Sequence, residues 1–357
     1  MDRIYLDWNA TAPLRLQARA AVSAALDVVG NPSSVHAEGR SARRLIEEAR
    51  ESVAALVGAE PRNVVFTSGG TEANMLALVP ASARDRLLVS AIEHPSVLAG
   101  GRFPAAAVER LPVDADGGIA LDALERRLAA LGGRALVSLM LANNETGVVQ
   151  PVSQAARLVH AAGSLLHVDA VQGCGRIPFD INTLEPDLVT ISGHKIGAPK
   201  GVGALVRRDA SVPFPAPLIS GGGQERGVRA GTENVAAIAG LGVAAAAARA
   251  SLAADGAHMT ALRDRLEAEL RAATPEVIIF GAGAERLPNT TLFAVPGMKA
   301  ETAVIAFDLE GIAVSPAPPA RPARSSHPTC WPRWGSHRRW RAGRCASVSV
   351  RPRRNPT

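Results

Sequence analysis

The chain has 357 residues, of which 47% are hydrophobic, and a chain of this size can bury a large core and form one large and one smaller domain. Its net charge is +6, but ten of its 39 basic residues follow residue 315, where no acidic residue occurs. The preceding body holds 29 basic against 33 acidic groups, and this mildly acidic balance excludes an extended nucleic-acid surface there.

The three cysteines, Cys174, Cys330 and Cys345, are too few for a disulfide framework and are typical of a reducing cytoplasm. The first residues show no basic segment followed by an apolar one, which argues against secretion. The longest apolar stretch, Val235–Ala248, is shorter than the roughly 20 residues that a membrane span needs. It predicts a packed core helix in a protein without membrane contact.

In chain order, the first clear element is a helix with apolar residues on one face from Ala42 to Val57, which ends at Gly58. Helices at Leu121–Leu131 and Val152–Ala161 then separate several apolar runs that predict strands. These runs are Val64–Phe66, Leu87–Ser90, Ala135–Leu141, Leu165–Val168, Leu188–Ile191 and Val202–Val206. The alternation predicts an α/β fold with a mostly parallel central sheet and helices on both faces.

Five of these strands are followed by polar segments. They are Thr67–Thr71, Glu93-His94, Asn143–Glu145, Asp169 and Lys195. Ligands bind beyond the carboxyl ends of the strands in sheets of this kind, so the sequence predicts one site at that edge.

The pattern changes after about Gly256 to a long helix, two strands and another helix, which predict a smaller α+β domain. Their ranges are His258–Ala273, Val277–Phe280, Thr290–Val295 and Ala300–Leu309. We predict a large domain at residues 1–255, whose segment 1–13 packs on the small one, and a partial small domain at residues 256–315. Residues 316–357 are rich in proline, arginine and tryptophan, and a basic disordered tail is one interpretation.

Lys195 is one of only three lysines among 39 basic residues. A lysine kept in so arginine-rich a chain indicates chemistry that arginine cannot do, because only the lysine amine can form a Schiff base. Asp169 ends an apolar strand 26 residues upstream, and Gln172 follows it. Pyridoxal phosphate needs a lysine for its aldehyde and an acidic partner for its ring nitrogen, so we predict that this cofactor binds here.

Each candidate has a simpler interpretation. Lys195 could lie on the surface, Asp169 could cap a helix, and His94 could be a buried core histidine. The remaining segments could be a turn at Asn143–Gly147, an ordinary strand-to-helix turn at Thr67–Asn74 and a flexible surface segment at Gly221–Arg226. A phosphate site at Thr67–Asn74 is the alternative there, because helix N-termini bind anions. No Gly-Lys-Ser/Thr run exists, which excludes a nucleotide P-loop, and we interpret Cys174 as a small core residue.

The chain resembles the cysteine desulfurases of the class V aminotransferases, in their nitrogenase and iron–sulfur-cluster branch. The resemblance runs from Tyr5-Leu6-Asp7 through Asn31–Ser34 to Gly311–Ser315, and its specific motifs are Ser192–Ile196 and Gly221–Thr232. It implies a fold-type I transferase, active as a homodimer, that converts L-cysteine to L-alanine. The sulfur would pass through an enzyme persulfide to an iron–sulfur scaffold or another acceptor protein.

The resemblance also implies a role for each residue of the site. Lys195 would bind the cofactor's aldehyde and move the substrate's α-proton, Asp169 would pair with the pyridine nitrogen, and His94 would stack on the ring. Asn144 and Gln172 would contact the ring oxygen. The phosphate would be held by Gly70, Thr71, Ser192 and His194, with Thr232 reaching in from the partner subunit.

The family's persulfide cysteine, expected near residue 320 in a Ser-Gly-Ser-Ala-Cys loop, is absent, and Pro316–Ala320 stands there instead. With GC-rich codons, a frame read one base earlier turns Pro316–Ala320 into Ala-Gly-Ser-Ala-Cys. The same shift turns Cys330–Gly335 into a helical Val-Leu-Ala-Ala-Met-Gly run. We therefore hypothesise a frameshift after Ser315 and expect this chain to be impaired in sulfur transfer. Two other hypotheses stay open: another class V enzyme, such as an aminotransferase or a selenocysteine lyase, and a non-catalytic protein with a basic tail.

Overall fold

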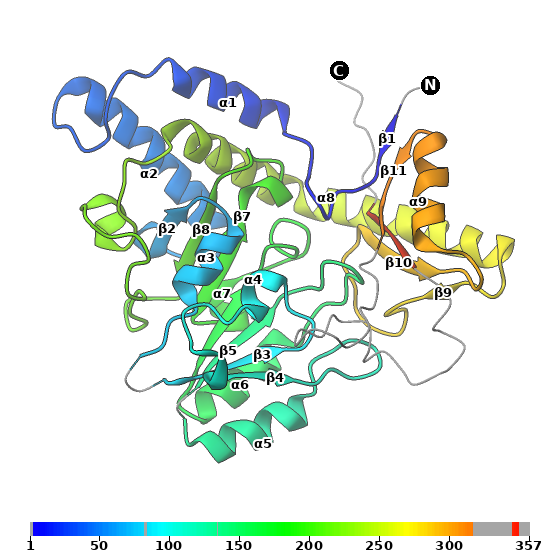
Figure 1. The fold of residues 1–357 in the computed structure, drawn as a ribbon. Coiled ribbons are helices and arrows are strands. Elements are labelled where there is room, and N and C mark those ends of the chain that lie inside the picture. Colours follow the sequence, from blue (N-terminus) through cyan, green and yellow to red (C-terminus); the bar gives the residue numbers. More distant parts are fainter. Residues whose placement is uncertain (1–2, 82–83, 134, 317–344, 350–357) are drawn as a thin grey trace.

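The computed structural model describes residues 3–81, 84–133, 135–316 and the backbone of residues 345–349. A large unit built on a central sheet is joined to a smaller unit by one long helix, α8, as Figure 1 shows. The two units follow one another along the chain, except that the N-terminal strand lies on the smaller one.

The central sheet has seven strands in the order β2-β8-β7-β6-β5-β3-β4. Their bounds are β2 Val64–Thr67, β3 Arg86–Ser90, β4 Val108–Leu111, β5 Ala135–Met140, β6 Leu165–Asp169, β7 Leu188–Ser192 and β8 Gly203–Arg207. Only β8 runs antiparallel to its neighbours, so the other six strands share one direction and their carboxyl ends lie at one edge. The mostly parallel α/β sheet predicted from the sequence is confirmed.

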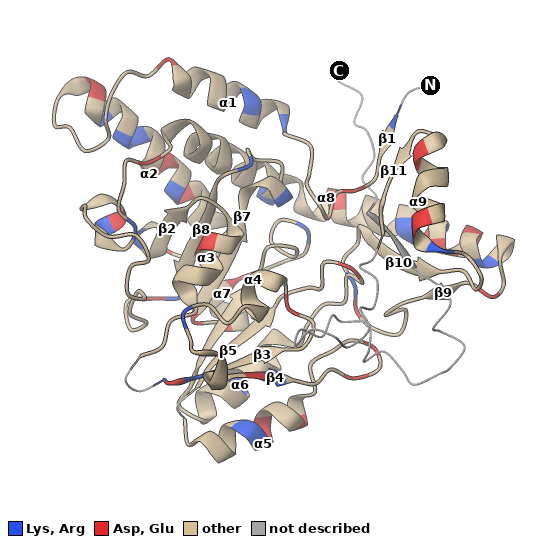
Figure 2. Ribbon diagram, in the orientation of Figure 1, with Lys and Arg blue, Asp and Glu red and all other residues tan. Residues whose placement is uncertain are grey.

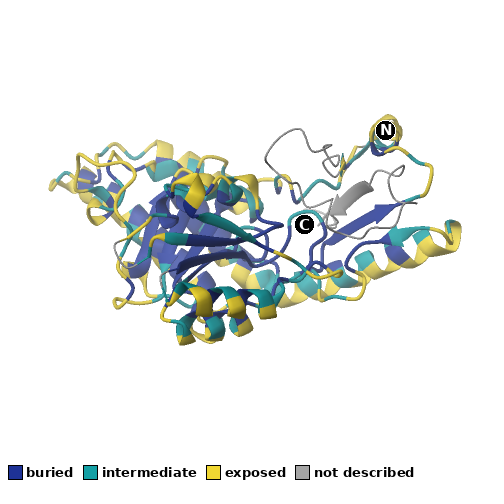
Figure 3. Ribbon diagram, turned by 60° about the horizontal axis from the view of Figure 1, so that its bottom comes forward, coloured by how far each residue is buried: buried dark blue, intermediate teal, exposed yellow. Residues whose placement is uncertain are grey.

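Helices cover both faces of this sheet. Alternate residues of one strand face opposite sides, and in β2 Val64 and Phe66 pack into the main core while Val65 packs against α3. The main core takes its helical residues from α1, α2, α5, α6, α7 and α8, and the other face is covered by α3 and α4. Apart from the edge strand β4, the strands are almost wholly buried beneath them (Figure 3).

The helices of the large unit are α1 Leu16–Leu26, α2 Ala37–Val57, α3 Gly70–Ala77, α4 Pro95–Leu98, α5 Leu121–Leu131, α6 Val152–Ala161 and α7 Ile181–Leu184. Helices α5 and α6 begin and end at the predicted residues, and α2 ends as predicted but begins five residues earlier, whereas no range was predicted for the other helices of the large unit. Gly58 ends α2 with φ of 73°, a left-handed conformation that glycine adopts without strain. Charged residues lie on helices such as α2 and α5 and in the loops, whereas most of the central sheet carries none (Figure 2).

The smaller unit contains β9 Ile278–Ile279, β10 Thr290–Ala294, α9 Ala300–Leu309, β11 Ile312–Ala313, β12 Ser315–Pro316 and β13 Cys345–Ser349. Strands β12, β13, β10 and β9 form an antiparallel sheet, and β1, at Ile4–Tyr5, pairs in parallel with β11. The predicted tail at residues 316–357 lies mostly outside the described residues.

Helix α8, Val235–Ala273, differs from the sequence-based expectation. We predicted a core helix at Val235–Ala248 and a separate one from His258, but the two form one helix of 39 residues. The linking residues contain no proline and several alanines, so the helix continues, and Gly256 weakens it by only about 1 kcal/mol relative to alanine. The expected domain boundary at 255/256 therefore falls inside a helix.

Helix α8 is the one described helix that is long and apolar enough to cross a membrane. Half of its most apolar window is buried inside the protein, where it packs against α1 and α2. This packing explains its alanine-rich sequence: Gly242 lies against Ala49 of α2 so closely that a Cβ there would come within 2.5 Å of the Ala49 backbone. The predicted core helix is the better interpretation.

Strand β4, Val108–Leu111, was not predicted. Its sequence, Val-Glu-Arg-Leu, holds two charged residues and gives no apolar run, because β4 is an edge strand whose outer face meets solvent.

Candidate active site

A cavity of about 800 Å³ opens at the carboxyl edge of the central sheet. It brings together nine of the ten predicted site residues: Gly70, Thr71, His94, Asn144, Asp169, Gln172, Ser192, His194 and Lys195. Thr232, the tenth, is exposed and lies outside this lining. The expected convergence of the five strand ends on one site is confirmed.

Lys195 lies in the turn directly after β7 and is mostly buried. Its amine donates a hydrogen bond to the backbone oxygen of Ala10 at 3.0 Å and another to that of Asn9. Burial lowers the pKa of Lys195 to about 8, helped by the positive charge of Arg176 and opposed by Asp169 and Asp7. An amine with this pKa has a substantial uncharged fraction near neutral pH, as a nucleophile requires.

Asp169 is the last residue of β6 and its carboxylate is buried. Oδ2 accepts a hydrogen bond from the Asn74 amide at 2.8 Å, and Oδ1 accepts one from the Val171 N–H at 3.0 Å. Burial raises the pKa of Asp169, whereas these donors and the charges of His94 and Lys195 lower it. The carboxylate thus shapes the local turn, as a capping residue would, and also lines the cavity.

His94 precedes α4 and borders the cavity, so the interpretation as a buried core histidine is wrong. Its Nδ1 accepts a hydrogen bond from the Ser96 N–H at 3.2 Å, which fixes the ring at the start of the helix. Burial of part of the ring lowers the pKa of His94; Asp169 opposes this shift and Lys195 adds to it. A largely neutral ring at the cavity wall follows from this balance.

The N-terminus of α3 forms one end of the cavity. A Cβ on Gly70 would lie 3.0 Å from Val171 and 3.3 Å from Ser192, so glycine lets the backbone approach both segments. His194 lies at the same end with its Nδ1 3.1 Å from the Thr11 hydroxyl. Burial lowers the pKa of His194 to about 4, and Lys195, Lys200 and Arg176 lower it further. Free helix N–H groups with hydroxyl donors suit an anion.

The glycine-rich loop at residues 221–232 is tied to this end of the cavity. Arg229 Nε donates to Glu72 Oε1 at 2.8 Å, and Glu72 Oε2 accepts from the Ser68 N–H at 2.8 Å. Glu225 in the same loop is buried and binds Arg50 through both carboxylate oxygens, at 2.7 and 2.9 Å. Glu225 is therefore fixed to the core, whereas Gly221, Gly222 and Gly223 are exposed, as the alternative of a surface segment expects.

Asn143 and Asn144, after the end of β5, have different roles: one forms a turn and the other lines the cavity. The Asn143 side-chain oxygen accepts hydrogen bonds from the N–H groups of Glu145 and Thr146, at 3.0 and 2.9 Å, and so forms the turn that the sequence suggested as an alternative. Asn144 lines the cavity. Cys174 is buried in the main core, and burial raises the pKa of its thiol to about 12, which confirms its interpretation as a core residue.

Several residues of the site were not predicted, among them Asn9, Asn74, Glu93, Arg176 and Lys200. Glu93 was seen only as a polar strand end; it is fully buried, where it accepts hydrogen bonds from Ser90 Oγ at 2.6 Å and Met140 N–H at 2.7 Å. Lys200 lines the cavity, and the rarity that singled out Lys195 applies to it equally. No sequence signal marks Asn9 or Arg176, because their role depends on contacts between distant segments.

The donor set of the cavity fits pyridoxal phosphate. It offers an amine with a lowered pKa, a buried carboxylate held by an amide donor, and a glycine-containing helix N-terminus for an anionic group. These are the three features that the aldehyde, the ring nitrogen and the phosphate of this cofactor require.

Comparison with known proteins agrees with this geometry. Residues 4–318 match the class-V aminotransferase family. A cysteine desulfurase of Cereibacter sphaeroides is 45% identical over 326 residues, which cover 88% of this chain and 82% of that relative. A NifS-like protein of Rickettsia africae has a solved structure with a TM-score of 0.87 and 35% identity, over 98% of this chain and 94% of the other. A structure of SspA in complex with cysteine has a TM-score of 0.78 and 27% identity, over 98% and 99% of the two chains.

The chain belongs to the class-V aminotransferases, enzymes of the fold-type I class that depend on pyridoxal phosphate. Within that family it belongs to the cysteine desulfurases. The family match ends at residue 318, close to the break in composition after Ser315.

Proposed function

We propose that this chain is a cysteine desulfurase that binds pyridoxal phosphate through Lys195 and converts L-cysteine to L-alanine. The observation that carries the proposal is the meeting of Lys195 and Asp169 in one cavity of about 800 Å³, within a fold whose relatives are cysteine desulfurases. One solved relative, SspA, was determined in complex with cysteine, which supports the choice of substrate.

The residues have distinct tasks in this proposal. Lys195 binds the cofactor's aldehyde, Asp169 holds the ring nitrogen in its protonated form, and His94 covers the ring. Asn144 and Gln172 bind the ring oxygen. When bound, the cofactor supplies a protonated ring that accepts the electron pair left at the substrate's α-carbon. The phosphate is held by Gly70, Thr71, Ser192 and His194, with Thr232 of a second copy.

Lys195 is also suited to move the substrate's α-proton. Its pKa of about 8 leaves roughly a tenth of the amine uncharged at pH 7, whereas an ordinary lysine would leave well under a thousandth. The bond from Asn74 keeps the Asp169 carboxylate turned into the cavity.

The second half of the reaction needs a thiolate that accepts the sulfur atom as a persulfide. Cys174 is unsuited to this task, since it is buried and its thiol pKa is about 12. The loop expected to carry the cysteine near residue 320 falls outside the described residues, and the sequence has no cysteine there. We therefore propose that the chain as written binds its cofactor but passes on little sulfur.

Two further proposals concern partners. The position of Thr232, exposed and outside the cavity of its own chain, supports a homodimer in which it serves the neighbouring site. An iron–sulfur scaffold or a related acceptor protein in the cytoplasm is the proposed destination of the sulfur, as in the branch that the sequence resembles.

A single preparation tests the function. Purified protein is mixed with pyridoxal phosphate, its visible absorption is recorded, and it is reduced with borohydride before the Lys195 peptide is weighed by mass spectrometry. We expect a yellow protein and a reduced cofactor adduct on Lys195 that K195A lacks. A colourless protein without an adduct would contradict the proposal. Alanine and sulfide measured with L-cysteine then report on sulfur transfer: vigorous turnover would refute the impairment, and the genomic DNA around codon 315 decides the frameshift.

A further inference from the structure

Arg176 lies beneath the cavity, in the turn that follows β6, and only 7% of it is exposed. Its Nη1 donates to Gln172 Oε1 and to Asn9 Oδ1, both at 2.6 Å. Its Nη2 donates to the backbone oxygen of Trp8 at 3.0 Å. One guanidinium thus joins the N-terminal segment to a residue that lines the cavity.

Asn9 carries this connection further. Its amide donates to the backbone oxygen of Asn144 at 3.1 Å and to Thr290 Oγ1 on β10 at 3.0 Å. Its own backbone oxygen accepts from the Gln172 amide at 3.0 Å and from the Lys195 amine. The smaller unit, the end of β5 and the reactive lysine therefore all meet at Asn9, which Arg176 holds in place.

The orientation of the Gln172 amide follows from this arrangement. A guanidinium can only donate hydrogen bonds, so the oxygen of the amide must face Arg176 and the nitrogen must face the other way. Turning the amide over would break a charge-assisted bond, which is about twice as strong as a neutral one. The amide of Gln172, which lines the cavity, is consequently fixed with its oxygen toward Arg176 and its nitrogen toward the backbone oxygen of Asn9.

We propose that Arg176 is a positioning residue that holds Gln172, Asn9 and the N-terminal segment in one arrangement around Lys195. The catalytic benefit of this arrangement rests on the proposed function, whereas the arrangement itself can be measured in the apoprotein. It predicts that loss of Arg176 alters the environment of Lys195 and loosens residues 7–11 together.

The charges that face Lys195 come from several segments. Asp169 at the end of β6 and Asp7 of the N-terminal segment favour the protonated amine, whereas Arg176 favours the neutral one. His94 and His194 also lie within range of Lys195 and are neutral in the main at pH 7, since burial lowers both of their pKa values. Arg176 is thus the cation among these groups whose removal shifts the balance toward a charged amine.

The apoprotein gives a readout that does not involve the cofactor. The chain has only three lysines, so protein labelled with ¹³C at the lysine ε-carbon gives three resolvable titrating signals, assigned with K200R and K299R. In R176Q we expect the Lys195 pKa to rise by on the order of one unit, which lowers the uncharged fraction at pH 7 about tenfold. R15Q is the matched control: Arg15 also donates to a neighbouring backbone oxygen, that of Ile196 at 2.8 Å, but it has no part among the groups that shift Lys195.

R176K separates the two effects, because it keeps the charge but lacks the second nitrogen, Nη2, that donates to the backbone oxygen of Trp8. We expect its Lys195 pKa to stay near the parent's, while hydrogen exchange at residues 7–11 speeds up at least about tenfold in both R176K and R176Q. An unchanged Lys195 pKa in R176Q, an equal shift in R15Q, or unchanged exchange in R176K would overturn the proposal. If R176Q does not fold, the exchange in R176K decides. A protein that never binds the cofactor would refute the proposed function and leave this result standing.

Discussion

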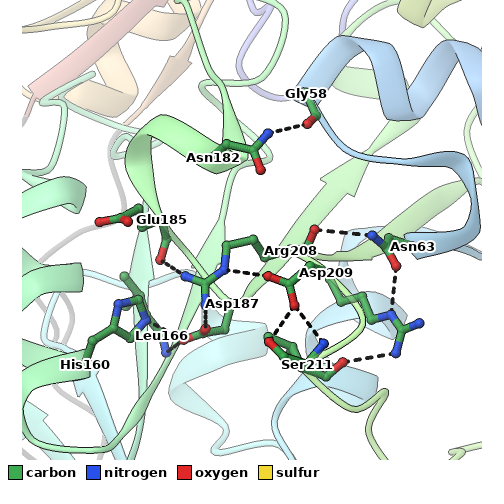
Figure 4. Close-up of polar contacts among 12 residues, drawn as sticks. Gly58, Asn63, His160, Leu166, Asn182, Glu185, Asp187, Arg208, Asp209 and Ser211 are labelled. Carbon is green, nitrogen blue, oxygen red and sulfur yellow. Dashed lines mark hydrogen bonds and ion pairs between the residues drawn. The ribbon is translucent and has the colours of Figure 1, made fainter.

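The two ends of the central sheet use similar side chains for opposite purposes. At the amino end, Asp187 precedes β7, and its buried carboxylate accepts from the Leu166 N–H at 2.7 Å and contacts His160 Nε2 at 2.9 Å and Arg208 Nη2 at 3.1 Å (Figure 4). At the carboxyl end, Asp169 shares a large cavity with His94 and Lys195.

The difference lies in the space and in the compensation of charge. Asp187 is enclosed by partners that satisfy it, so its cluster joins the start of β7 to β6, α6 and the end of β8 and stabilises the fold. Lys195 keeps a pKa of about 8, well below that of an ordinary lysine, because its burial is only partly compensated. Residue types alone do not make an active site; an open cavity and displaced pKa values do.

The comparison is tested most strongly at Lys195. In K195M, the covalent bond to the cofactor is lost, and removal of the α-proton from L-cysteine should slow by about 10²- to 10⁴-fold. The folded lysine loses its proton at about pH 8 and the unfolded one at about 10.5, so its burial costs up to about 3 kcal/mol below pH 8, and stability rises with pH between these values.

K195M should therefore also make the apoprotein more stable at pH 7 and remove the rise between pH 8 and 10.5. Urea unfolding of both apoproteins at several pH values checks this. A less stable K195M would contradict the idea that burial of the Lys195 amine costs stability at the carboxyl end of the sheet.

The next largest effect is expected at the amino end. D187A leaves the Leu166 N–H and the Arg208 guanidinium without their acceptor, and the free energy of unfolding should fall by about 3–5 kcal/mol. Cofactor affinity of the folded variant should not change.

The neighbouring D209A provides the control. Asp209 also pairs with Arg208, at 3.3 Å, but is half exposed, so we expect a change of less than about 1 kcal/mol. Equal losses of unfolding free energy in D187A and D209A would show that the buried cluster around Asp187 stabilises the fold no more than an exposed ion pair does.

Glu93 allows a pH-dependent test beneath the cavity. Burial raises the pKa of Glu93 to about 8, and the negative charge of Asp169 adds to this, so the folded protein keeps a proton there that the unfolded chain releases near pH 4.5. Stability should accordingly fall as pH rises from about 5 to 8, and E93Q should remove on the order of 3 kcal/mol of that fall. Unfolding curves at pH 5, 6.5 and 8 measure it; parallel pH profiles of the two proteins would sink this assignment.

The smallest effect is expected at Lys200. His194 is neutral at pH 7, because its pKa is about 4, so Lys200 supplies positive charge at the phosphate end. K200Q should weaken binding of pyridoxal phosphate about threefold to tenfold and reduce its salt dependence, since the lysine is exposed and screened. K299Q is the control, because Lys299 is the one lysine that does not line the cavity. Its affinity for pyridoxal phosphate, measured by titration of the apoprotein, should be unchanged.

Local sequence patterns predicted most of the strands of the central sheet. Six strands could be predicted from the sequence alone, because their apolar runs are short, bounded by turn residues and buried on both faces. They are β2, β3, β5, β6, β7 and β8. The charged edge strand β4 and the unbroken helix α8 were missed, because an edge strand shows no apolar run and an alanine-rich helix gives no signal where it crosses between units.

The apolar runs and the polar residues that follow them were enough to place Lys195, Asp169, His94 and Asn144 at one edge of the sheet. Their surroundings required the folded chain: Asn74 donates to Asp169, Glu93 is buried nearby, and Arg176 binds Asn9 across 167 positions of sequence. This is because the positions of strands along the chain follow from local periodicity, whereas hydrogen bonds and pKa values depend on neighbours that chain folding alone brings within a few ångströms.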